Sequence, residues 1–344
     1  MDVRLSAEQE ALRDAAARLV DRLGPRTVEA LEDVERRDKL DAALAAAGWR
    51  ELRSTAEAGG AWASAVETAL VAEELARGLA DTPFIGPTLA AELRRFAGAP
   101  TATHSETVAF DATLAALAVD SPGAEAGWLA IDAAGSRTAL LVRERDGDHH
   151  LLEMPIGLPL TAVDLTRPSA TAVGTVEPLP GAANALRADD MTRWYAFGLA
   201  LTCADLVGTM RGATSLATEY ASARHQYGVA VGSFQAVQHL LADALVATEG
   251  SRSIALHAAW AVDALAPDDA LAACASAKAY CSRAALAVCE TAIQVHGGIG
   301  NTWECLAHVF LRRALVSIDM LGGVGTNLDR VLAHQGIGAT HGLR

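Results

Sequence analysis

Apolar residues recur every three or four positions through the first hundred residues of the chain, which is the spacing of amphipathic helices. The clearest stripe consists of Leu12, Ala15, Ala16 and Leu19. Ser6 precedes this stripe and Gln9 follows three residues later, the spacing of a capping box in which the two residues bond each other's backbone N–H groups. Two further helical runs cover residues 40–47 and 63–79. We predict an N-terminal helical domain over residues 1–103.

Between residues 104 and 186 the pattern changes to short apolar runs separated by turn-forming residues. Strand-like stretches occur at residues 140–142 and 170–173. Asp146 and Gly147 lie between two apolar runs, and an Asp-Gly pair favours the tight turn of a β-hairpin because both residues tolerate a positive φ. We predict a small, mostly β middle domain over residues 104–186.

Helical patterns return in longer segments after residue 187. These segments cover residues 189–223, 233–263, 268–294 and 303–333. The first carries one apolar stripe, made of Trp194, Phe197, Leu201, Ala204 and Gly208. Four long helices of this kind indicate a bundle, so we predict a C-terminal four-helix bundle domain over residues 187–344. The predicted fold is therefore mainly α with a small β domain.

Charge and composition narrow the classes of partner. The formal net charge of −14 and the pI near 5.1 disfavour nucleic acid and anionic membranes, which would be repelled at long range. The chain has no run of roughly 18 uninterrupted apolar residues, the length that a membrane span needs. Its N-terminus also lacks the basic and apolar regions of a signal peptide. We therefore expect a soluble, cytoplasmic protein.

Cysteines and histidines do not predict a metal site. The five cysteines lie in apolar helical stretches without metal-ligand spacing and are interpreted as reduced core residues. The histidines near the two motifs described below form no ligand set of known type and are interpreted as satisfied helix residues: His225, His239, His296 and His308. Ser233 is not part of a nucleophile motif.

Two motifs in the last domain resemble signatures of the acyl-CoA dehydrogenase family. The first, RHQYGVAVGSFQAVQHLLAD, covers residues 224–243, and the second, QVHGGIG, covers residues 294–300. Weaker matches occur at Gly48-Trp49 and in the EELAR run at residues 73–77. The resemblance spans nearly the whole chain. It implies that family's fold, with an N-terminal helical domain, a middle β-barrel-like domain and a C-terminal four-helix bundle.

The same motifs suggest a phosphate-binding role. Arg224 closes a long helix, and its planar guanidinium suits phosphate. Gly297 and Gly298 can expose backbone N–H groups to a pyrophosphate. In the family, the matching segments hold the adenosine pyrophosphate part of FAD that a neighbouring subunit mainly binds. The resemblance therefore implies FAD as the cofactor and, as cofactor-binding residues, Arg224, Gln226, Tyr227, Gln235, Gln294, Val295, His296, Gly297 and Gly298.

The residues expected to perform the chemistry are missing. The family removes an α proton from an acyl-CoA thioester while the β hydrogen leaves as hydride to the flavin, so it needs a carboxylate base. Ungapped counting from the preceding arginine places Leu321 where many members have that glutamate. Other relatives carry the base immediately before an arginine that resembles Arg193, and Thr192 stands there. The middle domain is degenerate as well, since it lacks the family's Thr-Glu-Pro-Xaa-Ala-Gly-Ser-Asp loop.

This combination is similar to the short, base-less subunit of heteromeric acyl-CoA dehydrogenases of actinobacteria, which act on CoA thioesters of steroid side chains. That resemblance implies an α2β2 heterotetramer in which a catalytic partner subunit mainly holds the acyl-CoA, with an electron-transfer flavoprotein as a candidate electron acceptor. One alternative is a self-sufficient, homo-oligomeric enzyme with Asp319 as a non-standard base, although two residues correspond to about 200° of helix rotation away from Leu321. Another alternative is a cofactor-free scaffold of the same fold.

Overall fold

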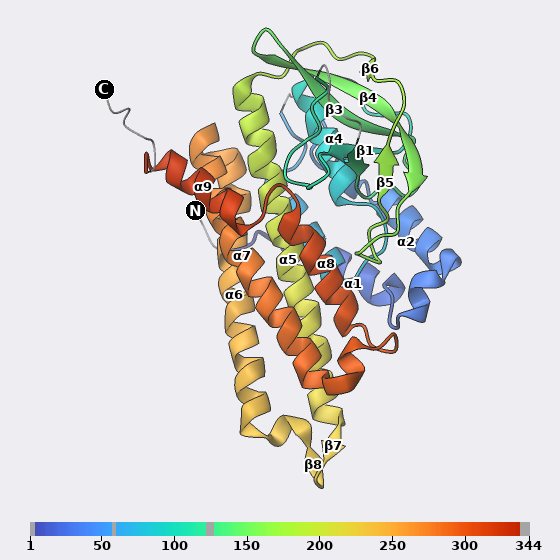
Figure 1. Cartoon of the computed structure of the whole chain (residues 1–344), viewed down its shortest axis with the longest axis vertical. Helices are drawn as coiled ribbons and strands as arrows, with labels where there is room; N and C mark the ends of the chain where they lie inside the picture. Colours follow the sequence, from blue (N-terminus) through green and yellow to red (C-terminus); the bar gives the residue numbers. More distant parts are fainter. Residues whose placement is uncertain (1–3, 57–59, 122–126, 338–344) are drawn as a thin grey trace.

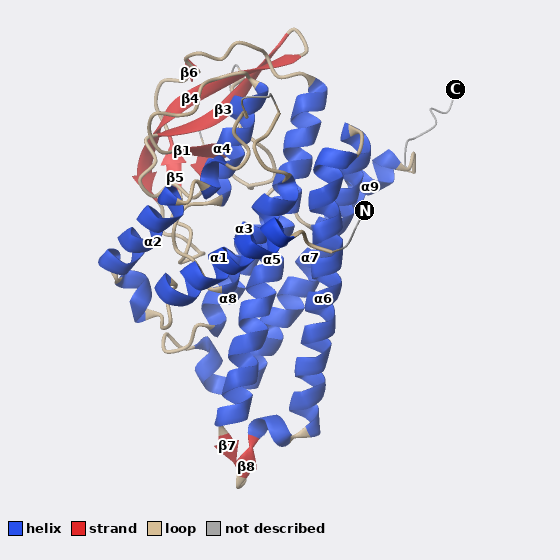
Figure 2. Cartoon of the chain, turned by 180° about the vertical axis from the view of Figure 1, so that it is seen from behind, coloured by secondary structure: helices blue, strands red, loops and turns tan. Residues whose placement is uncertain are grey.

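The computed structural model describes residues 4–56, 60–121 and 127–337. Long helices form a column that ends in a small hairpin, while a β-barrel and shorter helices surround its other end (Figures 1 and 2). The mainly α fold with a small β domain is confirmed. Within the described ranges, no helix is both long enough and apolar enough to cross a membrane.

The N-terminal part consists of short helices. They are α1 (Ala7–Leu23), η1 (Glu29–Glu32), α2 (Val34–Ala46), η2 (Trp49–Glu51), α3 (Ala65–Arg77) and α4 (Ile85–Phe96). The predicted capping box is confirmed, because Gln9 N donates to Ser6 Oγ at 3.2 Å and Ser6 N donates to Gln9 Oε1 at 3.0 Å. A second box, between Ser64 and Glu67, starts α3. Helix α4, which carries Pro87 in its first turn, was not predicted from the sequence.

The middle part is a closed barrel. Its strands are β1 (Glu106–Phe110), β2 (Trp128–Ala130), β3 (Thr138–Arg145), β4 (Asp148–Pro159), β5 (Ala170–Ala172) and β6 (Glu177–Pro178). They follow the order β3-β1-β2-β5-β4-β6, and the additional pairing of β3 with β4 closes the sheet. Asp146 (φ +56°) and Gly147 (φ +86°) form the predicted turn between β3 and β4.

The C-terminal part contains α5 (Ala188–Ala223), β7 (His225–Gln226), β8 (Val229–Ala230), η3 (Val231–Ser233), α6 (Gln235–Ala264), α7 (Pro267–His296), η4 (Gly297–Asn301), α8 (Ala307–Asp319) and α9 (Val324–His334). One expectation is wrong, because residues 303–333 do not form a single helix. The chain turns between α8 and α9, where Leu321 has φ +60° and Gly322 has φ +92°. Glycine at residue 322 adopts the positive φ of that turn without steric cost, whereas leucine at residue 321 does so with backbone strain.

The boundaries between the three domains stay predictions. Helices give way to strands between Phe96 and Glu106, and strands give way to helices between Pro178 and Ala188. A single apolar core nevertheless runs through the helical parts. Helices α3 and α5 approach closely at Gly208, where a Cβ atom would lie 2.0 Å from the carbonyl oxygen of Glu73. Glycine at residue 208 therefore allows these two helices to touch.

Candidate functional site

The first motif forms the projecting end of the bundle, at the bottom of Figure 1. Arg224 ends α5, and its N–H donates to the carbonyl of Tyr220 at 2.8 Å. The next residues form the β7–β8 hairpin, whose turn is Tyr227 (φ +54°) and Gly228 (φ +81°). The hairpin holds Gln226 and Tyr227 outward, and the Tyr227 side chain is 95% exposed. Gln235, also exposed, is the first residue of α6.

The second motif ends α7. Gly297 has φ +64° and terminates the helix, and η4 follows it. A Cβ atom at Gly297 or at Gly298 would meet nothing within 4 Å, so the backbone of both residues is open to a ligand. Gln294 is exposed and Val295 is half-buried. This end of α7 therefore presents an amide side chain beside accessible backbone.

A ring contact joins the two motifs. His296 stacks on Tyr220, with ring centroids 4.5 Å apart, and Tyr220 lies one turn before Arg224. The His296 side chain is buried beneath the surface, and its Nδ1 bonds to the Ala292 carbonyl at 2.7 Å. Burial alone would lower the pKa of His296, but contact with the Cys305 thiol and with that carbonyl raises it above its ordinary value. His296 thus fixes the position of the second motif against the first.

The polar groups at this end suit a diphosphate. In the part of the chain that the structure describes, no carboxylate pairs with Arg224, and the side chains of Gln235 and Gln294 make no hydrogen bond. A free guanidinium, two amides and open glycine backbone are the donor types that bind phosphate oxygens. These residues fit the adenosine diphosphate part of FAD. Because they lie on a projecting surface, these groups are open to a ligand that approaches from outside the chain.

Leu321 is the residue that the sequence predicts at the first family base position. It is completely buried, and its N–H donates to the Leu114 carbonyl at 2.7 Å. A Cβ atom at Gly198 would lie 2.4 Å from Leu321 Cδ1, so the leucine packs directly on α5. Asp319 is exposed at the last turn of α8. The helix ends there, so the expectation that both residues lie on one helix, about 200° apart, is wrong.

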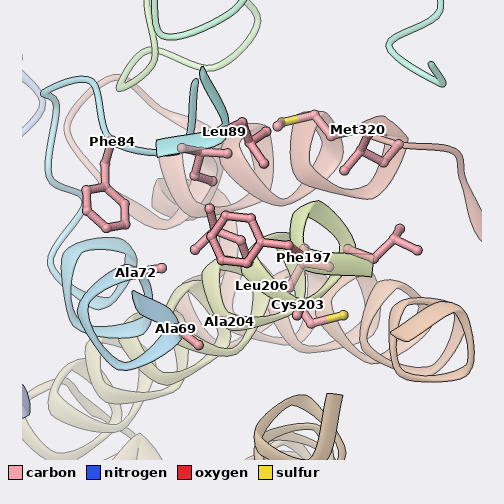
Figure 3. Close-up of a cluster of buried hydrophobic side chains, with 14 of the residues drawn as sticks. Ala69, Ala72, Phe84, Leu89, Phe197, Cys203, Ala204, Leu206 and Met320 are labelled. Carbon is pink, nitrogen blue, oxygen red and sulfur yellow. The ribbon is translucent and has the colours of Figure 1, made fainter. Parts of the chain in front are cut away.

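Apolar side chains fill the volume around Leu321. Trp194 and Phe197 of α5 are at most 1% exposed, and Trp194 Nε1 donates to the Leu89 carbonyl at 3.0 Å. Figure 3 shows Phe197, Leu89 and Met320 within one apolar cluster. Native cores are packed to the density of organic crystals, so this volume does not admit a thioester without rearrangement. Thr192, which the sequence predicts at the second base position, lines a separate cavity.

A buried charge network was missed by the sequence analysis. Arg313 Nη2 donates to Asp205 Oδ1 at 2.6 Å, and Arg167 Nε donates to Asp164 Oδ2 at 2.6 Å. Arg167 also lies 3.5 Å from Asp205 Oδ2. Burial alone would raise the pKa of Asp205, but Arg167 and Arg313 outweigh it and the pKa lies below its ordinary value. The signal in the sequence is an aspartate inside the apolar α5 and the Asp-Leu-Thr-Arg run at residues 164–167.

One histidine differs from its prediction. His308 is buried, and neither ring nitrogen has a hydrogen-bond partner among the described residues, so the expectation of a satisfied histidine is wrong there. Its ring packs against the Trp303 ring instead, with the two ring centroids 5.0 Å apart.

Lys278 of α7 is completely buried and donates to the carbonyls of Ser317 and Met320, which end α8. Lys278 therefore fixes the turn that carries Leu321.

Lys278 should make stability depend on pH. Burial lowers its pKa from 10.5 to about 8, against the opposing effects of Cys203, Cys281 and Asp205. The unfolded chain then binds more protons between these two values, so stability rises with pH in that window. Between about pH 7 and pH 10, wild type should gain about 2–3 kcal/mol relative to Lys278→Met, measured by urea unfolding. A difference that stays flat or falls across this range would contradict the lowered pKa.

The helical domain, the closed barrel and the bundle with a phosphate-suited end define a class, the flavin-dependent acyl-CoA dehydrogenase fold. Comparison with family models agrees. The model described as "Acyl-CoA dehydrogenase, N-terminal domain" matches residues 6–108, and "Acyl-CoA dehydrogenase, C-terminal domain" matches residues 195–327. The chain belongs to the acyl-CoA dehydrogenase family. FAD is the cofactor of that family, so the prediction of FAD as the cofactor is confirmed.

Individual relatives match over nearly the whole chain. Acyl-CoA dehydrogenase IpdE2 of Mycobacterium tuberculosis is 29% identical over 329 residues, which cover 91% of this chain and 93% of the relative. IpdE2 of Mycolicibacterium smegmatis is 29% identical over 348 residues, covering 96% and 99%. The ChsE4-ChsE5 complex from Mycobacterium tuberculosis contains a similar chain, with a TM-score of 0.77, 23% identity, and coverage of 98% and 99%. The Tcur3481-Tcur3483 steroid ACAD has a TM-score of 0.78, 21% identity, and coverage of 96% and 98%.

Proposed function

We propose that this chain is the non-catalytic subunit of a heteromeric acyl-CoA dehydrogenase and completes the FAD site of a catalytic partner subunit. One observation carries the proposal: an exposed, unpaired Arg224 with open glycine backbone coexists with a buried leucine where the sequence predicts the family's base. Arg224 is free to contact a ligand, whereas Leu321 is sealed in the core. Retained cofactor contacts without a base are what a supporting subunit needs.

The division of tasks follows from the side chains. FAD supplies hydride acceptance when it is bound. Leu321 cannot take a proton at any pH, and neither can Thr192 act as base for a carbon acid, so the α proton must leave to a carboxylate of the partner. The partner would then also hold most of the acyl-CoA. This chain contributes Arg224 and the exposed amides, which bind and orient the diphosphate, and the open backbone of Gly297 and Gly298, which allows close approach.

Exposed apolar side chains support a partner subunit. Tyr227 at the hairpin tip is 95% exposed, and Leu245 and Val246 on α6 are 54% and 72% exposed. Large apolar side chains grouped on one element mark surfaces that another protein covers. The names of two structural neighbours point the same way, since one is a two-component complex and one is called a steroid ACAD. We propose an α2β2 heterotetramer in the cytoplasm, acting on a steroid-derived acyl-CoA, with an electron-transfer flavoprotein as electron acceptor.

The test compares the chain alone with the reconstituted complex. The chain purified alone should hold far less than one FAD per chain and should show no flavin reduction when acyl-CoA is added. A complex with a subunit that carries the family's glutamate should retain flavin and reduce it. Exchanging that partner glutamate for glutamine should abolish reduction while flavin stays bound. Stoichiometric FAD and acyl-CoA-dependent reduction in the isolated chain would contradict the proposal.

A further inference from the structure

A second cavity lies where the start of α5 and the start of α7 meet the barrel and α9. Its volume is about 370 Å³, which is within the range of small-molecule sites. The walls are mainly apolar and include Leu117, Val142, Met191 and Leu271. Thr192, Tyr195, His149 and Arg330 are the polar residues on its lining. An apolar chamber with a few polar groups is the usual composition of a ligand site.

Arg330 gives this cavity a positive charge without a counter-ion. Its Nη1 donates to the Leu321 carbonyl at 2.7 Å and to Asn327 Oδ1 at 2.8 Å. Its guanidinium lies over the Tyr195 ring, 5.6 Å from the centroid. No ion pair joins Arg330 to a carboxylate in residues 4–56, 60–121 or 127–337. Burial lowers its pKa, as expected for a cation that no acid compensates. Its Nε and Nη2 donors make no hydrogen bond within the same ranges.

Two neutral groups converge on the same space. The Tyr195 hydroxyl accepts a hydrogen bond from Leu117 N at 3.2 Å, which leaves its own proton to donate. Burial raises the pKa of Tyr195, so that proton stays on the hydroxyl. His149 Nδ1 is buried, and no described residue bonds to it. Asp111 acts electrostatically on Tyr195, and its carboxylate already accepts from the backbone of Thr113 and Ala115.

We propose that this cavity binds a small carboxylate with an apolar body. The carboxylate would take the unused donors of Arg330 and the hydroxyl proton of Tyr195, and the apolar body would fill the chamber between the barrel and α5. An amine is excluded by the uncompensated guanidinium, and a free phosphate would leave the apolar walls without a partner. The site would bind without turnover, because no carboxylate base lines it. This inference does not depend on the heteromeric assembly.

Calorimetry on the full chain tests the site with octanoate and octanamide as probes. The two molecules share one chain length and differ in charge. Octanoate should bind at least about tenfold more tightly, because charge-assisted hydrogen bonds to Arg330 are lost with the amide. In Arg330→Gln, octanoate affinity should fall about tenfold or more, to the level of the amide. Inorganic phosphate should not bind measurably to either protein.

Two further variants separate binding from folding, since Arg330 also holds the Leu321 carbonyl. Ala188 is exposed and lines the cavity, so Ala188→Trp should obstruct the opening and abolish octanoate binding while Arg330 stays in place. Arg18→Gln changes an exposed arginine on α1 and should leave binding unchanged. Equal affinity for both probes, unchanged octanoate binding in Arg330→Gln, binding of phosphate alone, or no octanoate binding to wild type would each overturn the proposal.

Discussion

Replacing Arg224 by alanine should lower the FAD affinity of the assembled complex by about 10- to 100-fold, because hydrogen bonds to a charged group contribute about 1.5–3 kcal/mol each. The effect should be large for a surface residue. Arg224 is exposed, ends α5, and pairs with no described carboxylate, so its charge is available to the diphosphate. The readout is flavin released on dilution of the complex, followed by the rise in free flavin fluorescence.

The matched control is Arg18→Ala, which removes an exposed arginine from α1, away from the bundle end. It should leave flavin retention unchanged. A conservative Arg224→Lys variant should retain an intermediate share, because an ammonium keeps the charge and loses the planar fork. If Arg224→Ala retained flavin as well as wild type, the cofactor-free scaffold would be the better account of this chain.

Replacing Asp205 by asparagine should destabilise the chain by about 3–5 kcal/mol, the usual cost of breaking a buried ion pair from one side. The substitution keeps the side-chain volume and removes the charge that Arg313 and Arg167 share. Both guanidiniums would stay buried, with Asp164 still paired to Arg167 and with Asp132 acting on both without a direct ion pair. The network joins α5, α8 and the segment that follows β4, so its loss should affect the whole chain. Urea unfolding followed by circular dichroism measures the change.

Glu35→Gln is the corresponding control. It breaks the exposed pair between Glu35 and Lys39 on α2, and exposed pairs contribute about 0–1 kcal/mol. Its unfolding midpoint should therefore lie close to that of wild type. A loss of less than about 1 kcal/mol in Asp205→Asn would mean that the buried network is not required to hold the three parts together.

Local signals predicted much of the fold. The Ser6 and Gln9 spacing fixes the start of α1, and the Asp-Gly pair at residues 146–147 fixes the β3–β4 turn, because both depend on neighbours in the chain. The break between α8 and α9 has one local signal that was overlooked, the glycine pair at residues 322–323, whereas nothing in the sequence indicates the positive φ of Leu321. That conformation is imposed by tertiary contacts, including the bond to the Leu114 carbonyl.

In the candidate site, too, the features that depend on local sequence were predicted and those that depend on contacts between distant residues were not. The motifs around Arg224 and Gln294 were found from their residues, but the Tyr220–His296 stack that brings them together is a contact between helices far apart in sequence. Arg330 and Asp205 were missed for a related reason. A polar residue in an apolar helix shows that a partner is needed, and the sequence does not say which residue it is.

The packing of Leu321 against Gly198 limits how this protein could regain a base at residue 321 during evolution. A glutamate restored at residue 321 would place a carboxylate in the fully buried apolar space beside Gly198 and Leu89, and a buried charge that finds no partner costs several kcal/mol. A single reversion would thus damage the protein before it brought back any proton transfer. The apolar side chains that pack beside Gly198 would have to change first, with no benefit at that stage. Once leucine is packed at residue 321, the surrounding core therefore opposes its reversion to glutamate.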